Sequence, residues 1–112
     1  ELTYLHVGSN QLTALDVSNN TLLGTLFTGF NLLTSLDVSL NTALTVLKCG
    51  SNQLTSLDVS TNIALENLDI WSNQITSLDV SSNTALTILN ASRNYYISII
   101  KIKFSIYVLN VF

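Results

Sequence analysis

The sequence predicts a mainly β solenoid of about four and a half coils, each 21 residues long, with short parallel strands and little or no α-helix. Three observations predict this fold class. Apolar and polar positions alternate through the middle of each unit, as in strands. Asparagine recurs at positions 10, 20, 31, 41, 52, 62, 73, 83 and 94, so that intervals of ten and eleven residues alternate. These intervals leave no room for a ten-residue helix.

Each coil has two unequal halves, and both fit the pattern LxxLxVxxN. The first half-type, as in LTSLDVSLNTA from Leu33, begins at 12, 33, 54 and 75. The second, as in LTVLKCGSNQ from Leu44, begins at 2, 23, 44, 65 and 86. We expect the leucine and valine positions to point inward, because residues two apart in a strand share a face. This predicts two buried rows: Leu15, Leu36, Leu57 and Leu78, and Leu26, Leu47, Leu68 and Leu89.

The asparagine that ends each half is expected to be buried and to bond the backbone of its turn. Its amide both donates and accepts hydrogen bonds, so stacked asparagines can satisfy turn groups that would otherwise lack partners. We expect this of Asn41, Asn52, Asn62 and Asn73 in particular.

These residues carry a family resemblance. The unit LxxLxVxxNxL resembles the strand consensus of leucine-rich repeats. The DVSxNTAL and LxCxxNQL segments are similar to the short repeats of bacterial surface and secreted proteins, over Leu2 to Asn94. The resemblance implies a non-catalytic, curved scaffold that binds proteins or glycans, often as one module of a larger protein. It also implies an extracellular or cell-surface location.

Composition and single residues argue against several other classes. Only 10% of residues are charged and the net charge is −3, so the basic footprint of a nucleic-acid-binding protein is missing. The sequence has no run of 18 or more apolar residues, so it predicts no membrane span. The segment that begins at Glu1 does not have the pattern of a signal peptide. His6 points outward and Cys49 inward, so no Cys–His nucleophile is expected. The sequence therefore predicts no enzyme and no cofactor.

The outward positions of the second half-type differ strongly from coil to coil. They mix aromatic, basic and acidic groups, whereas the equivalent positions of the first half-type barely change. Aromatic anchors dominate binding energy in many interfaces, although drift on an unused surface would give the same variation. The predicted ligand-binding residues are Tyr4, His6, Phe27, Lys48, Asp69 and Trp71.

The outward positions of the first half-type form a repeated Asp column, Asp16, Asp37, Asp58 and Asp79. Stacked in register, these carboxylates would stand about 5 Å apart, and their repulsion is expected to raise their pKa values. The column is a weak candidate for a cation such as calcium. Its spacing also matches that of retaining glycosidases, but catalysis needs two carboxyls in different environments. The favoured interpretation is that each Asp bonds its neighbouring serine and backbone.

The sequence divides into a solenoid, residues 1–96, and a hydrophobic strand-forming tail, residues 97–112. With a one-residue insertion the repeat would continue as Ile97, Ile100 and Ile102, with Ser105 in the asparagine place. The rest of the tail would cover the end of the solenoid or pair with another molecule. A second function therefore stands beside the first: a structural subunit of a larger assembly or filament, stacked through solenoid ends and tail. We expect contact with a second copy rather than a free monomer.

Overall fold

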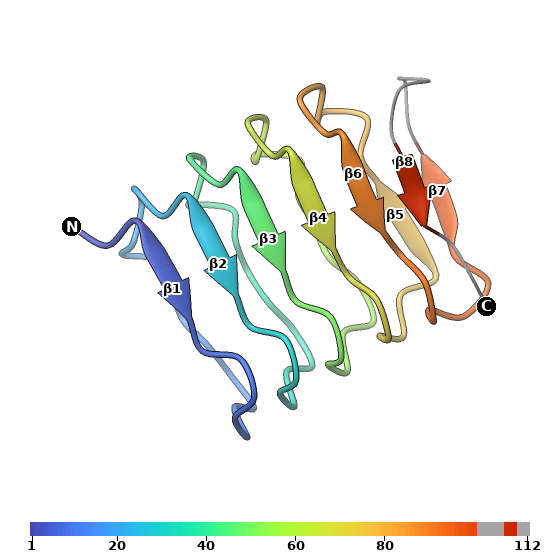
Figure 1. Ribbon diagram of the computed structural model, residues 1–112, viewed down its shortest axis with the longest axis horizontal. Helices are drawn as coiled ribbons and strands as arrows, with labels where there is room; N and C mark the ends of the chain where they lie inside the picture. Colours follow the sequence, from blue (N-terminus) through green and yellow to red (C-terminus); the bar gives the residue numbers. More distant parts are fainter. Residues whose placement is uncertain (101–106, 110–112) are drawn as a thin grey trace.

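The computed structural model describes residues 1–100 and 107–109, which form a solenoid of stacked coils (Figure 1). None of these residues is helical, so the predicted mainly β class is confirmed. No helix in the described part has the length and apolar character needed to cross a bilayer. The strands are β1 (Tyr4–His6), β2 (Thr25–Phe27), β3 (Val46–Lys48), β4 (Asn67–Asp69), β5 (Ser77–Asp79), β6 (Ile88–Asn90), β7 (Ser98–Ile100) and β8 (Tyr107–Leu109).

One side of the solenoid is a six-stranded parallel sheet in the order β1-β2-β3-β4-β6-β8 (Figure 1). Its first five strands come from the second half-type. They pair at the 21-residue period, so Leu5, Leu26, Leu47, Leu68 and Leu89 form one row across the sheet. The first half-type lies on the other side, where β5 and β7 form a two-stranded parallel sheet.

The core contains the predicted pair of leucine rows, the inward valine positions and leading apolar positions of the halves, such as Leu33 and Leu44. Leu26, Leu47 and Leu68 are fully buried. Leu36, Leu57 and Leu78 are also buried, whereas Leu15 is partly exposed because it lies in the first coil. Cys49 takes an inward valine position and is fully buried, and this burial raises the pKa of its thiol to about 12. Its neighbour in the same inward column, Thr28, is also fully buried.

After the first coil, each asparagine of the second half-type bridges two coils, whereas Asn10 bonds only within its own turn. The Nδ2 group of Asn73 donates to the carbonyl of Ile70 in its own coil and to that of Cys49 in the preceding coil, both at 3.1 Å. Its Oδ1 accepts the N–H of Leu54, 19 residues earlier, at 3.0 Å. Asn31, Asn52 and Asn94 make the same three kinds of bond.

Three asparagines of the first half-type, Asn41, Asn62 and Asn83, use only half of their amide. The Nδ2 group of Asn62 donates to the carbonyls of Val38 and Asn41, at 3.0 and 2.9 Å, and Asn41 and Asn83 repeat this pattern. The Oδ1 atoms of these three asparagines are buried and have no hydrogen-bond partner among the described residues. The prediction of buried asparagines bonded to turn backbone is confirmed, but the two columns are not equivalent.

The residue before each second-type asparagine adopts a left-handed conformation, with φ between 52° and 59°. None of these residues is glycine, which is the residue that best tolerates this region. The column consists of Ser9, Phe30, Ser51, Ser72 and Arg93.

The start of the tail continues the repeat without the expected insertion. Leu78 pairs with Ile99, one full period later, and both Ile97 and Ile99 pack on the core. The prediction that Ile100 points inward is wrong, because its side chain is 52% exposed. The strict period prevails because it lets β7 bond β5, with Val80 N–H donating to the Ile100 carbonyl at 2.8 Å.

The predicted places of Ile102 and Ser105 lie outside the described residues. Strand β8 joins the six-stranded sheet of its own chain. There Val108 pairs with Leu89, which precedes it in the sequence by slightly less than one 21-residue period.

Candidate functional site

The exposed face of the six-stranded sheet brings the predicted ligand-binding residues together. The last residues of β1, β2, β3 and β4 are in register and form one column: His6, Phe27, Lys48 and Asp69. Tyr4 begins β1, and Trp71 follows β4 by two residues.

A groove of about 370 Å³ crosses this face over the first four coils. Five of the six predicted residues line it, and Tyr4 does not. The full lining is His6, Gly8, Ser9, Phe27, Gly29, Phe30, Lys48, Gly50, Asp69 and Trp71.

Phe27 is the centre of a first aromatic cluster in the groove. The rings of His6 and Tyr4 meet it edge to face, with centroids 5.5 and 5.7 Å away. The Lys48 Nζ lies 5.2 Å from the centroid of the same ring, within the range of a cation–π interaction. Tyr4 therefore supports the groove through Phe27, although it does not line it.

Trp71 forms a second cluster, which we call the aromatic wall: Phe30, Trp71 and Arg93. The indole lies so close against Gly50 that a Cβ atom added at Gly50 would collide with the indole Cδ1 and Nε1. The Phe30 ring meets the indole edge to face at 5.6 Å, and the Arg93 guanidinium lies 5.9 Å from its centroid. The Asp69 carboxylate accepts the Trp71 backbone N–H at 3.1 Å, which fixes the start of this turn.

Phe30 and Arg93 were not among the predicted residues. That prediction used the alternate outward positions of each half, including position 71 beyond the strand, whereas these two residues belong to the left-handed column between the last outward position and the asparagine. A signal was present, because that column is serine in three coils and changes to Phe30 and Arg93 in the other two. Comparing every register position, rather than the alternate outward positions alone, would have found them.

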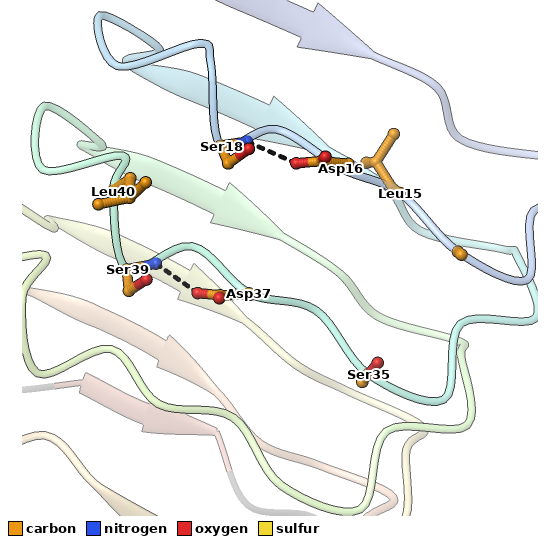
Figure 2. A pocket seen from close by; sticks show the side chains of 8 residues that line it. Leu15, Asp16, Ser18, Ser35, Asp37, Ser39 and Leu40 are labelled. Carbon is orange, nitrogen blue, oxygen red and sulfur yellow. Dashed lines mark hydrogen bonds between the residues drawn. The ribbon is translucent and has the colours of Figure 1, made fainter.

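Asp16 and Asp37 of the Asp column line a different groove of about 260 Å³ on the first-half-type side (Figure 2). Figure 2 shows Asp16 and Asp37, each turned toward the serine two residues later in its own coil. The carboxylate accepts that serine's backbone N–H at 2.8 to 2.9 Å in all four coils. These bonds agree with the interpretation favoured from the sequence, in which each Asp bonds its neighbouring serine and backbone.

The expectation that repulsion raises the pKa values of the Asp column is wrong. Hydrogen bonds from the hydroxyl and then the backbone N–H of Ser39 lower the pKa of Asp37, and they outweigh the opposing influence of Asp16 and Asp58. The pKa of each of the other three is also lowered by its serine. These carboxylates are exposed, so solvent screens their repulsion. The described residues contain no group of three or more His, Cys, Asp or Glu side chains arranged to hold a metal ion.

A family model for leucine-rich repeats matches residues 11–33. No curated protein matches the chain. Among solved structures, the functional domain of InlJ from Listeria monocytogenes, which includes a cysteine ladder, is similar with 36% sequence identity and a TM-score of 0.79. The similarity covers 88% of this chain and 24% of that one, so this chain spans about a quarter of the length of its relative. The 21-residue register, the stacked parallel strands and both similarities show that this chain has the leucine-rich-repeat fold.

Proposed function

We propose that this chain is a non-catalytic interaction module that binds a partner protein through the groove of its six-stranded sheet. Leucine-rich repeats generally serve as protein-interaction modules. The observation that carries the proposal is the convergence of Phe27, Phe30, Trp71 and Lys48 on one open groove, with Arg93 beside it over the Trp71 ring. Aromatic and arginine side chains supply most of the binding energy at protein interfaces.

The opposite side supports this assignment by contrast. The groove along the Asp column is lined by serine, aspartate, alanine and leucine, and it has no aromatic side chain. Its carboxylates already accept hydrogen bonds within their own turns, so a partner that used the same oxygen atoms would have to break those bonds. The two sides therefore differ in what they offer a partner.

A glycan is the alternative ligand of the same groove. Trp71 and Phe27, which are partly exposed, offer apolar surface to a sugar ring, and His6 and Asp69 offer polar groups beside it. Either ligand is consistent with an extracellular or cell-surface location, which we propose from the resemblance to repeats of surface and secreted proteins.

The test is capture of ligands on protein and glycan arrays by the intact chain and by a Phe27→Ala/Trp71→Ala double variant. We expect the double variant to lose capture while its circular dichroism spectrum stays unchanged. A Ser35→Ala/Ser56→Ala variant is the matched control, since both serines are exposed on the opposite side. Equal capture by the aromatic double variant and the intact chain would place the binding surface elsewhere.

Assembly through the solenoid ends is a second candidate function. Strand β1 has a strand partner on one side only in the described part. Its first residue, Tyr4, is 54% exposed, and Leu2 just before it is 41% exposed. An open edge of a parallel sheet can accept a further strand. Light scattering over a concentration series tests this, with deletion of residues 97–112 as the perturbation. A chain that stays monomeric at high concentration would exclude it.

A further inference from the structure

The charges of the described residues are distributed unevenly between the two sides. Lys48 and Arg93 are the two Lys or Arg side chains in the described part, and both are exposed beside the groove, each over an aromatic ring. Asp69 is the one acid that lines the groove, and it is bonded to the Trp71 N–H. Four exposed carboxylates occupy the opposite side: Asp16, Asp37, Asp58 and Asp79. An anionic ligand is therefore attracted to the groove and repelled by the other side.

Phe30 is a second, independent sign of a binding function. Its φ of 59° lies in a region that bulky side chains rarely adopt, and its side chain is 56% exposed, so burial does not offset the strain. Two positions later, Leu32 replaces the glutamine found at this place in three other coils, and it is 43% exposed. This single turn thus exposes two apolar side chains, one of which, Phe30, meets the Trp71 indole.

Gly50 is the residue that positions Trp71. The three nearest atoms to a Cβ added there all belong to the indole, and none belongs to the backbone. An alanine at this position would therefore displace the indole and leave the chain path intact. Gly24 provides a contrast, because its added Cβ would meet only carbonyl oxygens at 3.7 and 3.8 Å, which is ordinary contact.

We propose that the groove binds an acidic polypeptide segment that carries an aromatic or large apolar side chain. That side chain packs on the aromatic wall of Phe30, Trp71 and Arg93, and Gly50 positions the wall. The acidic groups of the segment pair with Lys48 and Arg93. This inference rests on the proposed function and adds the chemistry of the partner.

The observations favour a polypeptide over an acidic glycan. A glycan presents mainly hydroxyl groups, which need several aligned polar partners. In the described groove, the polar side chains are His6, Ser9, Lys48 and Asp69, and the Asp69 carboxylate already accepts the Trp71 N–H. The rest of the lining is aromatic side chain and glycine. Aromatic, arginine-flanked surface of this kind matches the composition of protein hot spots.

The experiment selects ligands without assuming a sequence. A random dodecapeptide phage library is panned on the full chain, with the Trp71→Ala variant in a parallel selection, and a glycan array that includes acidic polysaccharides is probed with the same protein. We expect peptides enriched in Asp or Glu together with aromatic residues, and we expect these peptides to be missing from the Trp71→Ala selection. Selected peptides are then titrated while the fluorescence of Trp71, the single tryptophan of the sequence, is monitored.

The variants separate the contributions of the wall and the cations. Gly50→Ala and Trp71→Ala should each weaken peptide binding about 30-fold, as expected for a hot spot. Gly50→Ala should have no further effect in the Trp71→Ala background, and Gly24→Ala should change nothing. Lys48→Met and Arg93→Gln should weaken binding and reduce its sensitivity to salt. Thermal unfolding of each variant checks that the fold is intact, and the cation variants test the proposal if Gly50→Ala does not fold.

Three outcomes would overturn the inference. Neutral or basic peptides that need Trp71 would refute the acidic chemistry and leave the proposed function standing. Capture of an acidic polysaccharide through Trp71, with no peptide selected, would make the ligand a glycan. Peptides that bind the intact chain and the Trp71→Ala variant equally would refute the proposed function as well, because the groove would not be the binding surface.

Discussion

The two asparagine columns should differ in their contribution to stability. In an Asn73→Ala variant, the buried N–H of Leu54 loses its Oδ1 acceptor, and the described residues offer it no other. The carbonyls of Cys49 and Ile70 each keep one bond, from Asn52 and Asn94 respectively. One fully orphaned buried N–H costs about 1–3 kcal/mol, and two weakened acceptors add about 1 kcal/mol. We therefore expect Asn73→Ala to lower the free energy of unfolding by about 3 kcal/mol.

Asn62→Ala should cost less, although Asn62 is the more deeply buried of the two. The carbonyls that it bonds, of Val38 and Asn41, also accept the backbone N–H groups of Asn41 and Leu44, so neither is orphaned. The substitution also removes the buried Oδ1 that has no partner among the described residues. We expect a loss of about 1 kcal/mol, because two secondary bonds are lost and one unsatisfied acceptor is relieved.

Equilibrium urea unfolding followed by circular dichroism measures both values. Asn10→Ala is the control, since Asn10 is exposed and its amide bonds only within its own turn, to the carbonyls of Val7 and Gly8. Equal losses for Asn62→Ala and Asn73→Ala, or a larger loss for Asn62→Ala, would refute the argument from orphaned groups.

The core and the Asp column yield four more expected outcomes. Thr28→Val should stabilise the fold by about 1 kcal/mol in urea unfolding, because the buried Thr28 hydroxyl has no partner among the described residues; a destabilised variant would show that the hydroxyl is bonded. Leu47→Ala should cost about 2–5 kcal/mol and Leu15→Ala clearly less, because only Leu47 is fully buried; equal losses would contradict this. The pKa of Asp37 is lowered on folding, so the Asp37 carboxylate stabilises the fold above its ordinary pKa of 3.8, and this stabilisation is lost as the pH falls through the folded value. The difference in Tm between wild type and Asp37→Asn should therefore shrink on acidification. A difference in Tm that stays constant with pH would contradict this prediction. Cys49 should resist a thiol reagent at mildly alkaline pH until urea unfolds the chain, because its thiol is buried with a pKa of about 12; rapid labelling of the native chain would contradict its burial.

The repeat made the fold predictable from the sequence, because each inward residue is repeated at the same register. Leu26 and Leu47 could be placed in the core without any knowledge of the chain path. The same register would also have placed Ile99 correctly. The error at Ile100 came from following the local alternation of apolar residues instead of the 21-residue period, which the hydrogen bonds between β5 and β7 obey.

The candidate site was less predictable, since it depends on side-chain directions that the repeat does not encode. The face could be chosen because its residues vary. That Trp71 turns back over Gly50 to reach Phe30, two coils earlier, depends on the missing Cβ at Gly50 and on the left-handed turn at Phe30. The pKa values of the Asp column were misjudged because the sequence gives charge spacing, but it does not give the hydrogen bonds that outweigh repulsion between exposed groups.

The bridging asparagines give the stack a direction. Each second-type asparagine after the first coil serves the coil before it: Asn52 accepts the N–H of Leu33, and Asn73 accepts that of Leu54. A cut between any two such coils therefore leaves unlike surfaces, one presenting unmet backbone groups and the other presenting free amides. Two surfaces with unmet backbone groups do not complement each other, and neither do two surfaces with free amides, whereas a surface of one kind complements a surface of the other. Whole repeat units can consequently be gained or lost by duplication and deletion without any new interface having to be invented, and the length of such a protein can change while its chemistry between coils stays constant.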